Sequence, residues 1–276
     1  MMDMHRFAAM GTEVVAVAAA ADAARVRRLF ETIERACSRV LPDSALERLN
    51  DGPERIALVP SALLGPVTAG DAMRRRTGGL VDIGLGSALE AWGYDRTFDE
   101  IAAVPDPPEP RPAWWHLHGS VLHRSPGLRL DLGGIAKGWA ADRAVEEGIA
   151  SVVSAGGDVR SAHAGTIVDV ADSREVTAVR ITLGIGALAT SSVARRRWQV
   201  AGGRAHHLID PRTLRPAATP VVSATAICST AVEAEAAAKA ILLLGEGGLA
   251  WADRQPWIRG AVAIWNDDSV YATTGL

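Results

Sequence analysis

The sequence has few cysteines, no long apolar run and no large excess of charge of either sign. Its two cysteines, Cys37 and Cys228, lie far apart in apolar surroundings and are expected to be buried free thiols, which argues against a fold held by disulfides. The formal net charge of −3 gives no reason to expect a nucleic acid or a membrane surface as a partner. The apolar stretch 14–21 is too short to span a bilayer.

The start of the chain also lacks the pattern of a targeting signal. Residues 1–6 show no basic segment followed by an apolar run and a cleavage site. We therefore expect a cytoplasmic protein without a membrane anchor.

What is present is the composition of a globular protein. A chain of 276 residues with 48% hydrophobic side chains can bury a large core, in one domain or in two closely packed lobes. We expect a single domain over 1–276. Strand patterns and helix patterns are mixed without regular alternation, which favours an α+β fold over a doubly wound sheet.

Several elements can be predicted from hydrophobic period and from turn residues. Five prolines between residues 104 and 112 predict an exposed loop. A helix that ends at Gly245 is expected because glycine favours the position after a helix. The predicted helices cover 22–38, 44–50, 61–76 and 231–244, and the predicted strands cover 12–20, 128–132, 261–265 and 270–273.

The run 130–142 carries the clearest sign of ligand binding. Its predicted strand ends at Asp131 and Leu132, two glycines follow, and a helix is expected to continue to about residue 147. Glycines let a ligand approach the backbone, and the N–H groups at a helix start suit a phosphate. Lys137 in the first helical turn adds a full positive charge. The alternative is an ordinary strand, turn and helix with a solvated lysine.

Two further segments carry polar side chains that suit chemistry. His206 and His207 would point to opposite faces of a strand, so at most one of them faces a site. A structural role is the alternative for either histidine. The hydroxyls of Thr190 and Ser191 could bond a phosphate or cap a turn.

These segments occur in an order that resembles a known family. The run 130–142 is similar to the DLGGIAKGYAxD segment of the ApbE family, the FAD:protein FMN transferases. The resemblance covers roughly residues 8–250. Six further segments match the family in order, and they lie at 10–12, 37–50, 77–93, 154–158, 189–191 and 207–213.

The resemblance implies a fold, a reaction and a set of residues. The expected fold is ApbE-like and related to the T-fold, with mixed sheets and packed helices. The expected reaction moves FMN from FAD to a Ser or Thr hydroxyl of an acceptor flavoprotein and releases AMP, with His207 as the base. The residues that match FAD-contacting positions are Met10, Val40, Leu80, Val81, Asp82, Asp131, Lys137, Thr190 and Ile209.

The chain departs from the family in the helix expected at 231–244. The family pattern there is ADALATALFVLG, whose Asp and Thr are magnesium ligands together with a carbonyl oxygen at the position of Gly134. This chain has Glu235 in place of the Asp and Lys239 in place of the Thr. A glutamate can still bind a hard cation, but an ammonium has donors only and cannot ligate.

This substitution admits two interpretations. Glu235 and Lys239 are four residues apart, so they can form an ordinary surface ion pair on one helix face. Alternatively, the ammonium of Lys239 occupies the place of the divalent ion. In that case Mg²⁺ binds weakly or not at all.

Other departures are smaller. Val40 replaces an aromatic residue, and Ser192 and Leu214 each replace a glycine. Members of the family are often exported lipoproteins anchored through an N-terminal cysteine, and this chain has no such cysteine near its start. Three functions stay open: the transferase, an FAD-binding protein with little or no transfer activity, and an FAD pyrophosphatase.

Overall fold

The computed structural model describes residues 2–101, 103–104, 107, 109–171, 176–200 and 203–274. These residues form two compact units. The first unit comprises Met1–Thr32, Lys137–Ala194 and Ala218–Leu276, and the second comprises Ile33–Ala136 and Arg195–Ala217.

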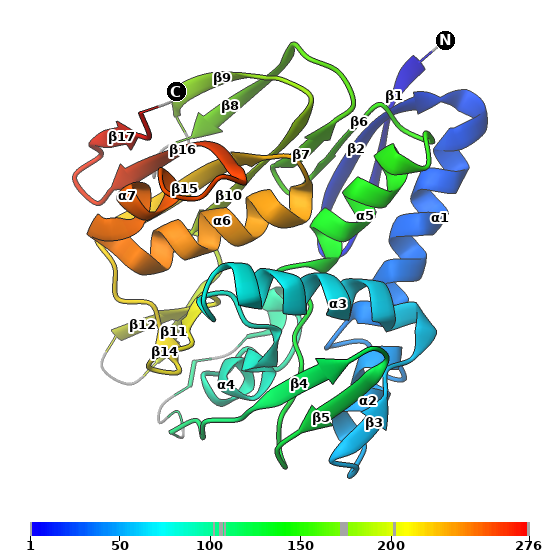
Figure 1. Ribbon diagram of the computed structural model, residues 1–276, viewed down its shortest axis with the longest axis vertical. Helices are drawn as coiled ribbons and strands as arrows, with labels where there is room; N and C mark the ends of the chain where they lie inside the picture. Colours follow the sequence, from blue (N-terminus) through cyan, green and yellow to red (C-terminus); the bar gives the residue numbers. More distant parts are fainter. Residues whose placement is uncertain are drawn as a thin grey trace. The chain divides into compact units, whose positions relative to one another are not determined.

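The first unit is built on one eight-stranded sheet in the order β1-β2-β6-β7-β10-β15-β16-β17, and every neighbouring pair is antiparallel (Figure 1). Buried and half-buried residues alternate along most of β2, as the period of two in a strand requires, whereas the first four residues of β10 are all buried because both faces of that strand are covered. The strands are β1 (Met2–Ala9), β2 (Thr12–Ala19), β6 (Val152–Ala155), β7 (Asp158–Ser161), β10 (Gly186–Ser192), β15 (Val221–Cys228), β16 (Ile258–Trp265) and β17 (Val270–Ala272).

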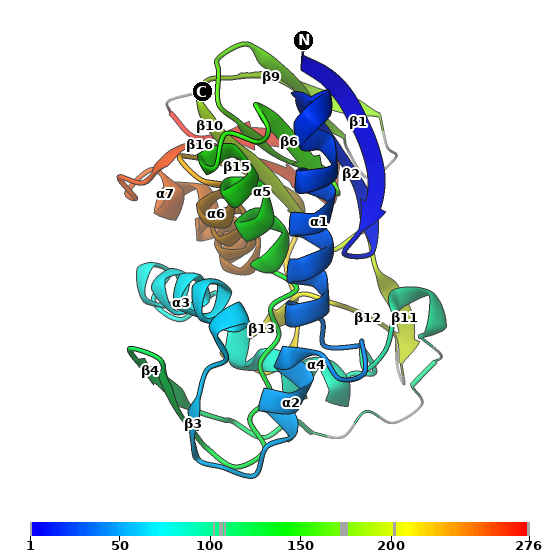
Figure 2. The same cartoon turned by 90° about the vertical axis from the view of Figure 1, so that its right-hand side faces the viewer.

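Helices cover one face of this sheet (Figures 1 and 2). The apolar helix α6 packs on β10 and β15, which present alanines such as Ala189 and Ala226 with no exposed surface. On the other face, β8 (Thr166–Ala171) and β9 (Thr177–Leu183) form a hairpin whose apolar residues pack with Leu188. The helices are α1 (Ala20–Cys37), α5 (Ala136–Glu146), α6 (Ala231–Leu244), η3 (Gly245–Gly247) and α7 (Gly248–Ala252).

The second unit contains short helices and small antiparallel sheets. A three-stranded sheet has the order β3-β5-β4, and β11–β12 and β13–β14 are two-stranded. The helices are α2 (Ala45–Asp51), α3 (Ser61–Arg76), η1 (Ile83–Leu85), α4 (Gly86–Ala91) and η2 (Phe98–Glu100). The strands are β3 (Ile56–Leu58), β4 (Trp115–His118), β5 (Val121–Arg124), β11 (Arg197–Val200), β12 (Gly203–His206), β13 (Ile209–Asp210) and β14 (Arg215–Pro216).

The α+β class is confirmed, and so are the long helices. The helix predicted over 22–38 begins two residues earlier, and Pro66 lies inside α3 without ending it. The start of α6 is fixed by a capping box between Thr230 and Glu233, and Gly245 takes the expected positive φ of 57° at its end. The final strand pair is also confirmed as β16 and β17.

The strand predicted over 128–132 is wrong, although its burial pattern is right. Leu128, Leu130 and Leu132 are fully buried as the alternation requires. No strand of the described residues pairs with this segment, because its backbone groups bond elsewhere. The side chain of Asn50 accepts from Leu130 N at 2.8 Å and donates to Leu130 O at 3.0 Å, in the manner of a neighbouring strand. The N–H of Asp131 donates to Ile83 O at 2.7 Å.

Two further predictions concern the proline-rich loop and membrane-spanning helices. The proline-rich loop predicted at 104–112 includes Pro105 and Pro108, which lie outside the described residues. Among the helices that the structure describes, none combines the length and the apolar character needed to cross a membrane.

Candidate active site

The predicted site residues divide between the two units. Lys137, Thr190, Glu235 and Lys239 belong to the first unit together with Met10. The remaining predicted residues belong to the second unit: Val40, Leu80, Val81, Asp82, Asp131, Gly134, His207 and Ile209.

In the first unit, two lysines share one carboxylate. Lys137 Nζ on α5 and Lys239 Nζ on α6 each donate to Glu235 Oε1 at 3.3 Å. The side chains are 15%, 18% and 6% exposed for Lys137, Lys239 and Glu235. The pair predicted between Glu235 and Lys239 therefore exists, but it is buried and is not the ordinary surface ion pair of the first interpretation.

The packing of α5 on the start of α6 positions this cluster. A side chain at Gly138 would meet the backbone of Ala231 and Val232 at about 3 Å, so glycine permits the close approach. The carboxylate of Asp142 accepts from Ala231 N at 2.8 Å and from Val232 N at 3.1 Å, which satisfies two N–H groups at the start of α6. Arg160 Nε forms an ion pair with Asp142 at 3.0 Å.

A second buried carboxylate, Asp158 on β7, interacts electrostatically with Glu235 and with both lysines. Its Oδ1 accepts from Thr190 N at 3.1 Å. Burial and the nearby charge of Glu235 raise the pKa of Asp158 to about 7. Burial also acts to raise the pKa of Glu235, but the ammonium groups of Lys137 and Lys239 outweigh it and lower that pKa.

The residues of this cluster do not fit a divalent cation. Mg²⁺ requires several oxygen ligands in near-octahedral geometry. Glu235 Oε1 already accepts from two ammonium groups, and Lys239 offers no lone pair. Glu235 Oε2 is buried and accepts no hydrogen bond from the described residues, so it is the one carboxylate oxygen of Glu235 left for a cation. No group of three His, Cys, Asp or Glu side chains that could hold a metal occurs within the described part of the chain.

Thr190 and Ser191 lie on opposite faces of β10. Thr190 is exposed, and its Oγ1 lies 2.9 Å from the Oγ1 of Thr225, which is its direct partner on β15. Thr190 shares the face of Leu188, where the β8–β9 hairpin packs, whereas Ser191 is buried on the opposite face. The predicted contact of Thr190 with FAD stays a prediction.

Met10 occupies a turn that rarely holds a methionine. Met10 and Gly11 form the two-residue turn between β1 and β2, and both have positive φ, 54° and 66°. Such turns favour Asn-Gly, because glycine has no β-carbon and asparagine tolerates a positive φ better than most other side chains. A strained residue of this kind is typical of a functional position. The predicted contact of Met10 with FAD stays a prediction.

In the second unit, Asp131 is held by Arg39, a residue that the sequence analysis did not single out. Arg39 Nε donates to Asp131 Oδ2 at 2.7 Å, and Gly133 N donates to Asp131 Oδ1 at 2.9 Å. Arg39 also donates to Tyr94 O at 2.5 Å and lies over the Tyr94 ring at 4.9 Å. Any ligand of Asp131 would thus share the carboxylate with Arg39. Arg39 lies within the family-like segment 37–50, which was the available signal.

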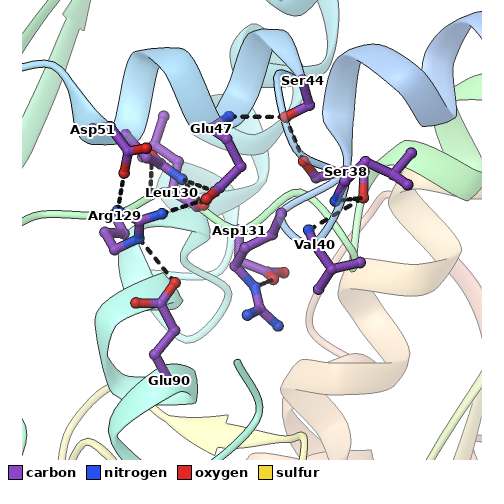
Figure 3. A network of polar contacts seen from close by, with 12 residues as sticks. Ser38, Val40, Ser44, Glu47, Asp51, Glu90, Arg129, Leu130 and Asp131 are labelled. Atoms are coloured by element: carbon purple, nitrogen blue, oxygen red, sulfur yellow. Dashed lines mark hydrogen bonds and ion pairs between the residues drawn. The ribbon is translucent and has the colours of Figure 1, made fainter. Parts of the chain in front are cut away.

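Arg129 links the segment 37–50 to other parts of the second unit. Its three guanidinium nitrogens contact three carboxylates (Figure 3), with distances of 2.6 Å to Glu47, 2.6 Å to Asp51 and 2.8 Å to Glu90. The fork of an arginine allows this arrangement, which a lysine could not reproduce. The network connects α2 and α4 to the extended segment before Asp131.

The residues predicted to contact the flavin, Val40 and Leu80 to Asp82, mostly make contacts that support the local fold. Asp82 Oδ1 accepts from Gly84 N at 2.7 Å and from the Trp115 indole N–H at 2.8 Å, so it caps η1. Val81 is buried and its N–H donates to Thr77 Oγ1. Leu80 and Val40 are half-buried. Their predicted contacts with FAD stay predictions.

Of the two adjacent histidines, His206 has a structural role. His206 Nε2 lies 3.1 Å from Ala217 O, and His206 Nδ1 accepts from Leu208 N at 3.3 Å. Both ring nitrogens are thus engaged, and burial lowers the pKa of His206. His207 is half-buried and lies just after β12. The role of His207 as the base stays a prediction.

The turn after His207 keeps a left-handed residue despite the loss of glycine. Leu214 has φ of 56°, and its carbonyl accepts from the Trp92 indole N–H at 2.9 Å. Its side chain packs with Ile209, which is buried in a cluster with Ala88 and Leu89. The visible role of Ile209 is therefore in the core.

Comparison with known proteins places this geometry in context. A model described as the ApbE family matches residues 10–262. The FAD:protein FMN transferase of Treponema pallidum is 30% identical over 288 residues, covering 90% of this chain and 78% of that protein. Among solved structures, the ApbE protein of Thermotoga maritima has a TM-score of 0.84 at 25% identity, covering 99% of this chain and 97% of that one. The flavin transferase ApbE of Vibrio cholerae has a TM-score of 0.80 at 23% identity, covering 100% and 98%.

Proposed function

This chain belongs to the ApbE family, and from that premise we propose that it moves FMN from FAD to a Ser or Thr hydroxyl of an acceptor flavoprotein. The family match over residues 10–262, which runs through both units, is the observation that carries the proposal. FAD is a substrate here, and the acceptor is a second protein.

One bond forms and one bond breaks in this reaction. The acceptor hydroxyl oxygen bonds to the phosphorus of the FMN half, and the bond from that phosphorus to the bridging pyrophosphate oxygen breaks. AMP leaves with the bridging oxygen. The hydroxyl proton passes to a base, and we assign this role to His207, because an imidazole has a pKa near working pH and its neighbour His206 is fully engaged.

The remaining predicted FAD contacts support the proposal to different degrees. Met10, in its strained turn, and Asp131, beside Arg39, have the geometry of functional positions. The other proposed contacts are Val40, Leu80, Val81, Asp82, Lys137, Thr190 and Ile209. Two buried free thiols, Cys37 and Cys228, support a cytoplasmic location as part of the proposal.

A transfer assay with His207→Ala tests the proposal. We expect covalent flavin on a candidate acceptor by mass spectrometry with the parent protein, and about 10²- to 10⁴-fold slower transfer with the variant, at little change in FAD affinity. His118→Ala, which removes an exposed histidine on β4 of the same unit, is the control and should transfer at the parent rate. Parent-rate transfer by His207→Ala would remove His207 from the chemistry.

The same assay separates the two alternatives, neither of which the comparisons favour. An FAD pyrophosphatase would release FMN and AMP without labelling any acceptor. An FAD-binding protein would bind the flavin and release neither product.

A further inference from the structure

Lysine is almost absent from this chain, and its two copies meet at one carboxylate. Of the 29 basic side chains, 27 are arginines and two are lysines, Lys137 and Lys239. Both donate to Glu235 Oε1. Arginine serves every other basic position, including exposed ion pairs such as Arg143 with Glu147. The use of lysine at these two positions therefore indicates a need for a compact point charge, which an ammonium has and a guanidinium lacks.

Burial argues against a purely structural purpose for the cluster. Charges are costly to remove from water, and apolar residues in place of a buried ion pair are often as stable or more stable. Here two cations share one anion, and the triad carries an excess of positive charge. Asp158 is the nearby carboxylate that interacts with both lysines, and it offsets part of this charge. A triad of this kind is suited to a bound anion.

The position of Lys137 adds to the same field. It lies in the first turn of α5, an 11-residue helix, where the N-terminal end of the helix dipole is positive. Lys239 approaches Glu235 from the following turn of α6. The two ammonium groups thus come from different helices, which Gly138 and Asp142 hold in close contact.

We propose that Lys137 and Lys239, held by Glu235, neutralise the pyrophosphate of FAD in place of a divalent cation. The proposal rests on the transferase function proposed above. Two ammonium groups carry the total charge of one divalent ion, and each has three N–H donors for phosphate oxygens. Because Glu235 Oε2 accepts no hydrogen bond from the described residues, either ammonium can move between the two carboxylate oxygens as it turns toward the anion.

The small number of lysines makes a direct test possible on the unmodified chain. Labelling with ¹⁵N-lysine gives two side-chain ammonium signals, one for each residue. With a chelator present, FAD should shift both signals, whereas riboflavin, which has no phosphate, should leave them in place. The FAD dissociation constant should agree within about twofold with and without magnesium. Unmoved signals with bound FAD, or FAD binding that requires magnesium, would overturn the proposal.

Variants give an independent measurement. Lys239→Met should weaken FAD binding by about ten- to a hundredfold, the range of a charge-assisted hydrogen bond, and leave riboflavin binding unchanged. Arg143→Met on α5 removes an equal charge from an exposed position and is the matched control, with no expected change. Equal losses for FAD and riboflavin in Lys239→Met would show a general disturbance and contradict the proposal.

The outcomes separate this inference from the function on which it rests. If the chain labels an acceptor only with magnesium and binds FAD only with magnesium, the inference fails and the function stands. If FAD shifts both ammonium signals in a chelator but no acceptor is ever labelled, the function fails and the site for pyrophosphate stands.

Discussion

The two units contain charge networks of opposite design. In the first unit, one carboxylate, Glu235, is shared by two lysines, and all three side chains are less than one-fifth exposed. In the second unit, one guanidinium, Arg129, is shared by three carboxylates, of which Asp51 is 67% exposed. The first network has an excess of positive charge inside the protein, and the second has an excess of negative charge near water.

This difference separates a functional cluster from a structural one. The Arg129 network is more exposed than the Glu235 cluster, so solvent screens its charges more strongly, and it connects α2 and α4. Solvent screens the Glu235 cluster only weakly. Its excess positive charge therefore destabilises the folded protein unless a bound anion neutralises it. Three measurements test this contrast.

The largest effect is expected for Glu235→Gln, which keeps the shape of the side chain and removes its charge. Two ammonium groups would then lie in one buried place without the carboxylate that binds both of them, and we expect a loss of about 3–5 kcal/mol in the free energy of unfolding by urea. Glu147→Gln, which removes an exposed partner of Arg143, should cost less than about 1 kcal/mol. Equal losses in the two variants would show that the Glu235 cluster is solvated.

The next effect is the pH dependence of stability, which reports on Asp158. Its pKa is raised to about 7 in the folded protein from an ordinary value of 3.8, so the folded state binds the proton more tightly. The contribution of Asp158 to stability is therefore fully present below about pH 4 and is lost as pH rises to about 7, with a slope of at most about 1.4 kcal/mol per pH unit. Asp158→Asn should flatten the curve in this window.

Asp142 provides the internal reference for that comparison. Its pKa is raised to about 6 by burial, so it contributes a similar slope between about pH 4 and 6 in both proteins. The difference between the two curves isolates Asp158. Superimposable curves for the parent and Asp158→Asn would show that Asp158 titrates normally.

The smallest effect is expected at the other network. Arg129→Lys keeps the charge and loses the fork that reaches three carboxylates, and we expect a loss of roughly 1 kcal/mol in unfolding free energy. Because the network is partly exposed, 1 M salt should reduce this loss, whereas the loss in Glu235→Gln should persist. A salt-independent loss in Arg129→Lys would erase the contrast between the units.

The sequence patterns predicted best those elements whose backbone hydrogen bonds are local, which are the helices. The helix at 231–244 was predicted to end at Gly245, and the structure adds the cap at Thr230 that fixes its start. The segment 128–132 could not be predicted correctly, because its hydrogen-bond partner is the side chain of Asn50, 80 residues earlier in the chain. An alternating pattern reports burial, and it does not say whether the partner of a backbone group is another strand.

The same limit applies to the site. Glu235 and Lys239 could be paired from their spacing on one helix. The third member, Lys137, is 98 residues from Glu235 and was predicted to face a phosphate, with no sign in the sequence of its bond to Glu235. Likewise, no local pattern could assign Arg39 to Asp131, which is 92 residues away.

The two lysines have a consequence for how the folded chain meets a protease. A lysine-specific protease has two peptide bonds to cut, after Lys137 in α5 and after Lys239 in α6, and both lie within helices whose lysines bond to Glu235. Cleavage requires a local opening that frees the lysine and unwinds the backbone around it. The rate of cleavage at these two bonds therefore measures how often the helices open around the Glu235 cluster. Slower cleavage with a bound ligand would show that the ligand stabilises the closed cluster.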